Sequence, residues 1–417
     1  MLLILLIIGM PIGFTLLIVG SLGIFIEGGW VSLNGLLSGI SFSTVNDFNL
    51  TTIPLFILMA HFISNSNLAK DIYNALLKWF GHIPGGIGIS TVIASAGLGA
   101  LSGSSVASTS VMSKISIPEL VKAGYKGSFA AGLVATATGT LAVMIPPSVP
   151  LIFYGVLTET SIGKLLIAGI VPGIMIAIFL SLLITFMSLR MDNKVQKASW
   201  RSRWVSLTSI WPMMLLVLFV IGSIYMGIAT ATESAALGAT GALIIGLLLK
   251  RLNIKSIISS VIKTTEQTAM IFIIIIGGYT FAYFMTMTGV GQSIINTISQ
   301  SSLPSGVILI MIIILYLILG LFMDMAGALI LTLPLVHPII VELGFSEIWF
   351  GVLVVLLVEI GLVTPPVGIN LFITSEYSKV PVKQVFYGSI PFILVLLLAV
   401  IILSIFPQIA LFLPNQM

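Results

Sequence analysis

The two stretches that decide this fold are TGTLAVMIPPSVP, residues 138–150, and LVEIGLVTPPVGI, residues 357–369. Each interrupts an apolar segment with two consecutive prolines. Proline lacks the backbone N–H donor and clashes with the preceding helical turn. The Pro-Pro pairs begin at Pro146 and Pro365, which lie 219 positions apart (365 − 146). This repeated break predicts two helices that are interrupted at matching places and leave carbonyl oxygens without helical partners.

Composition places these helices in a membrane. Of the 417 residues, 58% are hydrophobic and 7% are charged, whereas about 25% of an average soluble domain is charged. Such a chain cannot cover its apolar surface in water, which excludes a soluble enzyme, a nucleic-acid-binding protein and a disordered protein. Apolar runs of about 20 residues favour a helical bundle surrounded by membrane lipid over an outer-membrane barrel. The absence of cysteine excludes disulfides and cysteine-based metal sites.

Apolar segments long enough to cross a bilayer recur along the chain. The expected spans are 2–26, 50–66, 127–145 continuing to 155, 163–188, 207–226, 229–249, 268–287, 348–364 continuing to 373, and 385–411. Two further segments, 85–117 and 306–341, are broken near their middles by SGSS at 102–105 and MDMAG at 323–327. Irregular backbone at membrane depth needs protein or a water-filled cavity around it, so both predict re-entrant helical hairpins. Mixed polar and apolar faces predict surface helices at 31–48, 69–82 and 252–266.

The offset of 219 residues relates more than the prolines. It pairs Gly132 with Gly351, Gly169 with Gly388 and Pro172 with Pro391, and it carries Ser105 onto position 324. We therefore expect one repeat in 1–188 and a second in 229–417, each with a hairpin. The loop and unpaired helix in 189–228 would invert the second repeat. The expected fold is an all-α polytopic membrane protein with inverted repeats and two re-entrant hairpins, a plan typical of secondary transporters.

Lysine and arginine predict which loops face the cytoplasm. The two largest basic clusters are Arg190, Lys194, Lys197, Arg201 and Arg203, and Lys250, Arg251, Lys255 and Lys263. Segment 288–305 contains neither residue type and is expected outside. This assignment places the N-terminus in the cytoplasm and the C-terminus in the periplasm. The first hairpin then enters from the cytoplasm and the second from the outside.

Each repeat offers a hairpin break and a Pro-Pro break, and these four breaks form the predicted binding region. Hydroxyl and free carbonyl oxygens are suited to Na⁺, and helix N-termini suit a substrate carboxylate. The candidate sodium-binding residues are Ser102, Gly103, Ser104, Ser105, Gly139, Met323, Asp324, Gly327, Gly361 and Thr364. The candidate substrate-binding residues are Thr140, Pro146, Pro147, Ser148, Pro365, Pro366 and Gly368. The alternative is that these small and hydroxylated residues only allow close helix packing.

Ionisable residues near these breaks are few. Asp324 stands at the second hairpin tip, where it either takes part in ion or substrate coupling or caps the second hairpin arm. Glu233 is expected to cap a helix, and Glu359 is expected to be an interior hydrogen-bonding group with a possible functional role. The histidines are expected to be structural: His61, His82 and His337. The sequence contains no clear Ser/His/Asp arrangement or metal-ligand spacing, so an intramembrane enzyme has little support.

Motifs in both halves are distinctive: LSGSSVA at 101–107, GT at 139–140 with IPPS at 145–148, AGIVPG at 168–173, TATE at 230–233 and TPPVG at 364–368. They resemble the large membrane subunit of TRAP transporters (tripartite ATP-independent periplasmic transporters). The resemblance implies Na⁺-coupled import of organic acids, such as sialic acid or C4-dicarboxylates, across a bacterial inner membrane. It implies two partners, a small four-helix membrane subunit and a soluble periplasmic binding protein. It also implies an elevator, in which both hairpins and the Pro-Pro helices move as a transport domain against a scaffold of the remaining helices.

Three functions are therefore distinguished. The leading one is a secondary transporter subunit with Na⁺ as coupling ion and no organic cofactor. The second is a stand-alone sodium/anion symporter that needs no binding protein. The third is a membrane-embedded lipid-processing enzyme. Reconstitution separates them, because the first needs a binding protein and a Na⁺ gradient, the second only the gradient, and the third neither.

Overall fold

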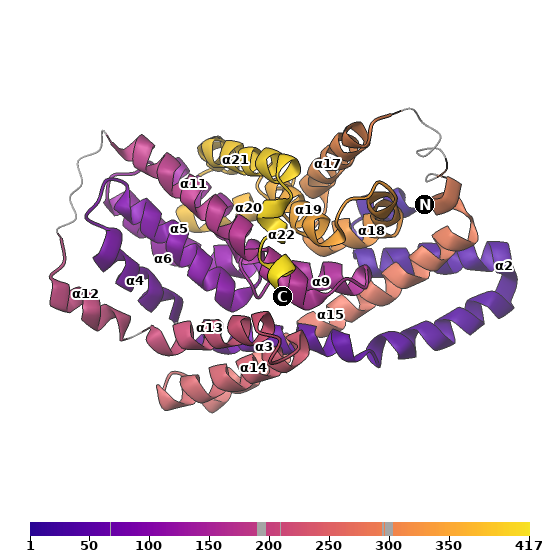
Figure 1. Ribbon diagram of the computed structural model, residues 1–417, viewed down its shortest axis with the longest axis horizontal. Coiled ribbons are helices and arrows are strands. Elements are labelled where there is room, and N and C mark those ends of the chain that lie inside the picture. Colours follow the sequence, from indigo (N-terminus) through magenta and orange to yellow (C-terminus); the bar gives the residue numbers. More distant parts are fainter. Residues whose placement is uncertain (67, 190–196, 209, 294–295, 297–302) are drawn as a thin grey trace.

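The computed structural model describes residues 1–66, 68–189, 197–208, 210–293, 296 and 303–417. Within these residues the chain folds into helices, turns and loops, without a β-strand. Nine of the described helices are long and apolar enough to cross a membrane. The expected all-α polytopic membrane fold is thereby confirmed (Figure 1). Two of the basic residues used for orientation, Arg190 and Lys194, and residues 294–295 and 297–302 of segment 288–305 lie outside the described residues.

The N-terminal helices differ from the expectation. The expected single span over 2–26 is divided into α1 (Leu2–Ile7) and α2 (Ile12–Val45), because Gly9, at φ +90°, and Pro11 interrupt the helix. Helix α2 continues through the segment expected as a separate surface helix, after a kink at Gly29 where φ is +70°. The surface segment expected over 252–266 is likewise the beginning of one long helix, α15 (Ile254–Met287). Sequence patterning detected the change from polar to apolar faces but not the continuity of the backbone.

Helices α2 and α15 lie side by side in Figure 1. Glycine permits this close approach. A Cβ on Gly277 would lie 2.3 Å from the carbonyl oxygen of Gly13, and a Cβ on Gly20 would lie 2.9 Å from the Phe281 nitrogen. Small residues at such crossings let membrane helices approach backbone to backbone. The α2–α15 pair is therefore a tightly packed unit on one side of the molecule.

Both predicted hairpins are present. The first consists of α5 (Gly86–Ser102) and α6 (Ser105–Lys122), and the second of α17 (Ser305–Phe322) and α18 (Met325–Glu342). Their breaks fall where the sequence predicted them, although α6 continues beyond residue 117. The offset of 219 residues carries the start of α5 onto the start of α17. The same offset carries Ile12, the first residue of α2, onto Ala231, the first residue of α14 (Ala231–Leu248).

Both Pro-Pro segments interrupt helices as expected. In the first half, α7 (Gly127–Leu133), a π-helical turn η2 (Val134–Thr138) and α8 (Gly139–Met144) lead to the break, and α9 (Val149–Leu157) follows it. In the second half, α19 (Glu347–Leu362) leads to the break and α20 (Ile369–Ser378) follows. Both Pro-Pro peptide bonds are cis.

The remaining elements surround these four interruptions. They are η1 (Phe48–Thr51), α3 (Thr52–Asn65), α4 (Leu68–Phe80), α10 (Ile162–Ala168), α11 (Ile170–Ser188), α12 (Trp200–Leu207), α13 (Trp211–Tyr225), α21 (Val382–Ile405), α22 (Gln408–Leu411) and η3 (Pro414–Gln416). The expected span over 163–188 is therefore two helices that meet at Gly169. A Cβ there would lie 2.2 Å from the Met144 carbonyl oxygen, so the break lets the start of α11 pack against the end of α8.

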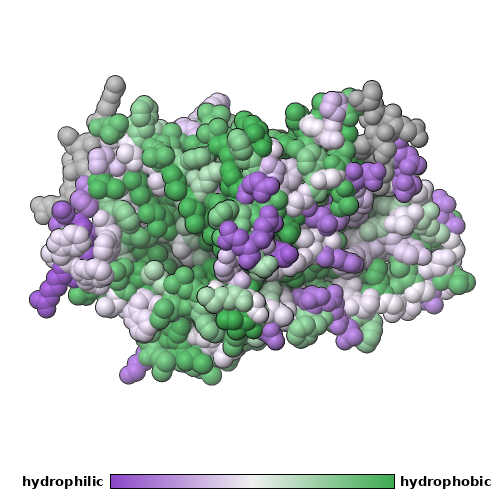
Figure 2. Space-filling model, viewed as in Figure 1, coloured by the Kyte–Doolittle hydropathy of each residue, from purple (hydrophilic) through white to green (hydrophobic). Residues whose placement is uncertain are grey.

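Helix α19 forms the centre of the molecule. Every residue from Trp349 to Leu362 is buried, including Glu359. Helix α17, in contrast, exposes apolar side chains, among them Ile310, Met311 and Ile314. Figure 2 shows large hydrophobic areas across the visible face. A surface of this kind requires lipid or another apolar surface around it.

Candidate transport site

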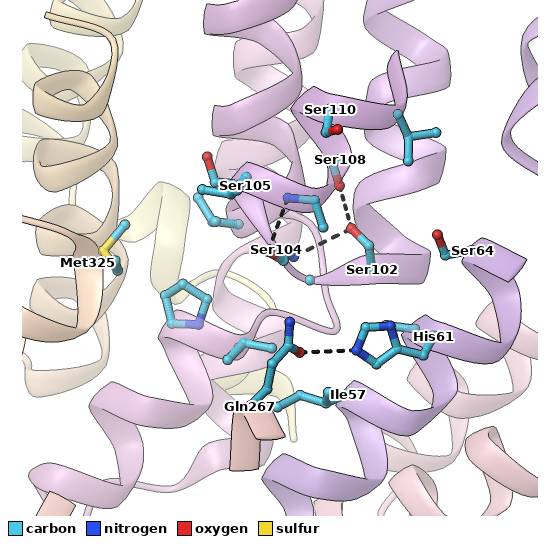
Figure 3. Close-up of a pocket in the computed structure, with 18 of the residues that line it drawn as sticks. Ile57, His61, Ser64, Ser102, Ser104, Ser105, Ser108, Ser110, Gln267 and Met325 are labelled. Carbon is cyan, nitrogen blue, oxygen red and sulfur yellow. Dashed lines mark hydrogen bonds between the residues drawn. The ribbon is translucent and has the colours of Figure 1, made fainter. Parts of the chain in front are cut away.

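A cavity of about 460 Å³ lies where the two hairpin tips approach α3, α9, α15 and α19 (Figure 3). Its polar lining residues are His61, Ser64, Asn65, Ser102, Ser104, Ser105, Ser108, Ser110, Lys263, Gln267, Asp324 and Glu359. The first hairpin tip contributes the densest group of hydroxyls. The cavity thus brings together residues from both halves of the chain.

The first hairpin tip is held against the first Pro-Pro break. Helix α5 ends at Gly103, which has a left-handed conformation with φ +59°. A Cβ at this position would lie 2.6 Å from the Pro147 carbonyl oxygen, so glycine is required for the close approach. The Val149 amide donates to the Gly103 carbonyl oxygen at 3.2 Å. Gly103 is therefore best explained as the residue that joins these two breaks.

Serine hydroxyls organise the backbone at this tip. Ser104 caps α6, its hydroxyl accepting from the Ala107 amide at 3.4 Å. The hydroxyls of Ser102 and Ser108 are hydrogen-bonded to each other, as Figure 3 shows. These serines line the cavity, so their oxygens are available to a ligand as well as to the protein.

The second hairpin tip has the same backbone connection. The Val367 amide, just after the second Pro-Pro pair, donates to the Leu321 carbonyl oxygen at 3.2 Å. Asp324 caps α18 by accepting from the Gly327 amide at 3.3 Å. The capping interpretation of Asp324 is thus confirmed. Its side chain also lines the cavity, so the cap leaves a second role open.

A buried hydrogen-bonded group ties the first tip to the second half. The Ser105 hydroxyl donates to Glu359 Oε1 at 2.6 Å, and Asn370 Nδ2 lies 2.8 Å from both the Ser105 hydroxyl oxygen and Glu359 Oε1. Glu359 and Asn370 have no exposed surface. Gly139 makes room for them, because a Cβ there would lie 2.3 Å from Glu359 Oε1. Gly139, predicted as a sodium ligand, therefore has a clear packing role.

Several oxygens around this group have no hydrogen-bond partner within the described part of the chain. They are Glu359 Oε2, Asn370 Oδ1 and Thr140 Oγ1, all of them buried. Leaving a polar group unpaired away from water costs about 1–3 kcal/mol, and a bare carboxylate costs more. A bound cation is one group that would satisfy such acceptors.

The opposite wall of the cavity comes from α3 and α15. His61 Nε2 and Gln267 Oε1 lie 3.2 Å apart, and Figure 3 shows the two side chains pointing toward one another. Asn65 Nδ2 donates to the Ser260 hydroxyl at 2.8 Å and so fixes α3 to α15. Lys263 and Gln267 are exposed and lie where the cavity meets the surface.

Five predicted site residues line this cavity: Ser102, Gly103, Ser104, Ser105 and Asp324. The other predicted residues are outside its described wall: Gly139, Thr140, Pro146, Pro147, Ser148, Met323, Gly327, Gly361, Thr364, Pro365, Pro366 and Gly368. Some of these have a visible structural role. A Cβ on Gly361 would lie 2.3 Å from the Gly320 backbone, Ser148 caps α9, and the Thr364 hydroxyl donates to the Ile360 carbonyl oxygen at 2.7 Å.

Sequence reasoning missed Asn65, Lys263, Gln267 and Asn370. Lys263 and Gln267 are four residues apart, so they share one face of α15. Lys263 falls in the surface helix expected over 252–266 and Gln267 directly follows it, but nothing local indicated that this face lines a cavity. Asn370 follows the second Pro-Pro break by a few residues. A polar amide side chain in an otherwise apolar segment was the sequence signal that could have identified it.

Two broken hairpins and two interrupted helices around one cavity define a secondary transporter built from repeats. The chain belongs to the tripartite ATP-independent periplasmic transporter family, DctM component, whose family model matches residues 1–409. It is 34% identical over 378 residues to the C4-dicarboxylate TRAP transporter large permease protein DctM of Pseudomonas aeruginosa, covering 90% of this chain and 88% of that protein. It is 30% identical over 418 residues to the sialic acid TRAP transporter large permease protein SiaM of Vibrio cholerae, covering 98% and 95%.

A solved structure shares the fold. The YdaH transporter of Alcanivorax borkumensis, described as having an unusual topology, superposes with a TM-score of 0.70. The match covers 95% of this chain and 96% of that one at 13% identity, which establishes the fold alone. The chain is therefore a multi-pass large permease subunit of the TRAP family, whose members work with a periplasmic binding protein and a small membrane subunit. Its relatives are transporter permeases rather than enzymes.

Proposed function

We propose that this chain imports an organic acid together with Na⁺, through the cavity between its two hairpin tips. The observation that carries the proposal is the Ser105–Glu359–Asn370 group, in which a hairpin tip of one half meets a buried carboxylate of the other. The acid is delivered by a periplasmic binding protein, and a separate small four-helix subunit completes the membrane complex. The names of two relatives support an organic acid as the substrate, because C4-dicarboxylates and sialic acid are all carboxylic acids.

Na⁺ coupling is supported by the free oxygens at the first tip. Glu359 Oε2 and Asn370 Oδ1 are buried, unpartnered and adjacent to the tip hydroxyls. A monovalent cation there offsets the charge of a carboxylate that has no basic partner among the described residues within salt-bridge distance. Asp324 adds a second negative charge at the cavity wall. Ion binding and the contact between the first tip and α19 then depend on the same atoms.

The proposed mechanism is an elevator. Both hairpins and the interrupted helices α7–α9 and α19–α20 form the transport domain, and the remaining helices, including the α2–α15 pair, form the scaffold. The cavity lies between these two groups of elements. Lys263, at its edge, belongs to a basic cluster that the positive-inside rule assigns to the cytoplasm. In this orientation, with the N-terminus inside and the C-terminus in the periplasm of a bacterial inner membrane, the cavity opens inward.

The test is reconstitution of the chain with its small subunit in liposomes, with the binding protein added outside. Uptake of labelled carboxylic acids, succinate and sialic acid among them, should require an inward Na⁺ gradient. Full uptake in Na⁺-free buffer under a pH gradient would overturn Na⁺ coupling. Na⁺-driven uptake without the binding protein would instead identify a stand-alone symporter.

A further inference from the structure

The walls of the transport cavity are mostly apolar. Six different helices contribute large apolar side chains to it: Leu98, Val143, Phe153, Met270, Met325 and Leu362. A small, highly charged acid would lose its hydration against these groups without gaining compensating hydrogen bonds. The cavity therefore favours a ligand with a substantial apolar part.

Charge within the cavity is unevenly placed. Lys263 is the one Lys or Arg among the described residues that line it, whereas Asp324 and Glu359 both carry carboxylates. A Na⁺ bound near Glu359 would offset the charge of that carboxylate, and an ionised Asp324 would then leave the hairpin side negative. An anionic group is consequently attracted to the α15 side, where Lys263 stands, and repelled from the opposite side.

Three of the helix N-termini near the cavity already have side-chain acceptors of their own. Ser104 accepts from the Ala107 amide in α6 at 3.4 Å, and Ser148 accepts from the Leu151 amide in α9 at 3.3 Å. Asp324 does the same for α18. The start of α20, where Ile369 lines the cavity, has no side-chain cap and offers only the partial charge of a helix N-terminus. The ammonium group of Lys263 carries a full positive charge and is therefore the stronger attraction for a carboxylate.

Lys263 has polar neighbours suited to a carboxylate. Gln267 lies one turn further along α15 and on the same face. Its carbonyl oxygen is hydrogen-bonded to His61 of α3, which leaves the Gln267 amide group to donate elsewhere. All three side chains line the cavity, and Figure 3 shows Gln267 and His61 below the serine-rich tip.

We propose that the cavity selects a monocarboxylate with an apolar body, whose carboxylate binds Lys263 and the Gln267 amide while its body lies against the apolar walls. This inference rests on the proposed transport function and specifies the substrate class of the same site. A second carboxylate, as in a C4-dicarboxylate, would lie either against apolar side chains or toward Asp324 and Glu359. Both positions weaken binding, the first by desolvation and the second by like-charge repulsion.

The test uses a matched pair of probes, 4-methyl-2-oxopentanoate and 2-oxoglutarate, which share the 2-oxo acid end and differ in whether the far end is apolar or charged. Binding to the purified full chain is measured by titration calorimetry in NaCl and again in choline chloride. The monocarboxylate should bind at least about tenfold more tightly, a difference of about 1.4 kcal/mol. Equal or tighter binding of 2-oxoglutarate would overturn the inference, as would the absence of monocarboxylate binding up to about 10 mM.

Variants locate the carboxylate. Lys263→Gln should weaken monocarboxylate binding about tenfold, and Lys263→Arg should retain most of it. Lys255→Gln is the matched control, because Lys255 is an exposed lysine of the same helix outside the cavity wall. Equal affinities of Lys263→Gln and Lys255→Gln would refute the role of Lys263. Na⁺-dependent binding that favours the dicarboxylate would refute this inference and support Na⁺ coupling. Na⁺-independent binding that favours the monocarboxylate would support this inference and contradict Na⁺ coupling.

Discussion

The two hairpin tips share a backbone plan and differ in their side-chain connections. In each, an amide just after a Pro-Pro pair donates at 3.2 Å to a carbonyl oxygen at the end of the first hairpin helix. At the first tip, Ser105 is tied to Glu359 and Asn370 of the other repeat. At the second tip, Asp324 bonds to Gly327 of its own helix. The repeat has thus kept its backbone contacts while its polar side chains have diverged.

Burial follows the same division. Pro146 and Pro147 are buried, whereas Pro365 and Pro366 are exposed. Helix α5 of the first hairpin is almost wholly buried, and α17 of the second presents an apolar face to its surroundings. This difference makes the first break the more deeply buried part of the site. We therefore expect changes at the first tip to affect ion binding and stability more than equivalent changes at the second.

The largest effect should come from Gly139→Ala. The added Cβ would lie 2.3 Å from Glu359 Oε1 and 2.5 Å from Asn370 Nδ2, both on fully buried side chains. The hydrogen-bonded group of Ser105, Glu359 and Asn370 would therefore have to move apart. Overpacking of this kind costs about 1–3 kcal/mol. We expect a clear fall in melting temperature, measured by tryptophan fluorescence, and loss of the melting-temperature increase that Na⁺ produces.

Gly327→Ala makes the matched change at the second tip, where the nearest atom is Asp324 Oδ1 at 2.8 Å, on an exposed side chain. Its effect should be smaller. Gly39→Ala is the control, since nothing lies within 4 Å of the position in α2. If Gly327→Ala proves as disruptive as Gly139→Ala, the two tips do not differ as described.

The next largest effect concerns the two carboxylates. Glu359→Gln retains the shape of the side chain but removes the negative charge at the buried tip. The Na⁺ concentration that half-saturates the thermal shift should rise about tenfold, or about 1.4 kcal/mol. Asp324→Asn removes a charge that is partly open to solvent, so its shift should be only about twofold. A greater loss in Asp324→Asn would move the main cation site to the second tip.

Neighbouring serines give a finer comparison. Ser105→Ala deletes the hydroxyl that donates to Glu359 and should reduce both stability and Na⁺ affinity, at a cost of about 1–3 kcal/mol. Ser104→Ala deletes a helix cap and should cost about 1 kcal/mol of stability, with a lesser fall in Na⁺ affinity. Unchanged Na⁺ dependence in both variants would assign these serines to packing alone.

The smallest effect is expected at the second cap. Asp324→Ala removes the acceptor for the Gly327 amide and should lower stability by about 1 kcal/mol, close to the loss in Ser104→Ala. Asp324→Asn retains an acceptor and should restore most of that stability. Thermal unfolding of the three variants side by side makes the measurement. A failure of the asparagine variant to restore stability would show that charge, not capping, matters at Asp324.

Much of the fold was predictable because its signals are local. Two Pro-Pro pairs, two polar breaks in apolar segments and one constant offset located every interruption at the site. The cap at Glu233 was also predictable, and the structure contains a full capping box between Thr230 and Glu233. The continuity of α2 through its surface segment was not, because a kinked helix and two separate helices have the same hydrophobic pattern.

The site itself was only partly predictable. Ser105 was identified, but its partners lie 254 and 265 positions further along the chain. No periodicity reports a contact at such a distance. Two of the histidines fit their structural interpretation, since His337 bonds Glu347 and His82 bonds Arg203. His61, in contrast, lies in the cavity wall, a placement that depends on how α3 packs against α15.

If both tips move together around one cavity, the side of the membrane from which each tip can be reached should change. The chain has no native cysteine. Val149→Cys and Ile369→Cys each place one thiol in the cavity wall, next to the first and second Pro-Pro breaks. Each is labelled with an impermeant thiol reagent from either side of the membrane, with and without Na⁺, in the complete transporter. We expect both thiols to react from the cytoplasmic side in one condition and from the periplasmic side in another. Labelling confined to one side in every transport-competent condition would contradict a joint movement of the two tips.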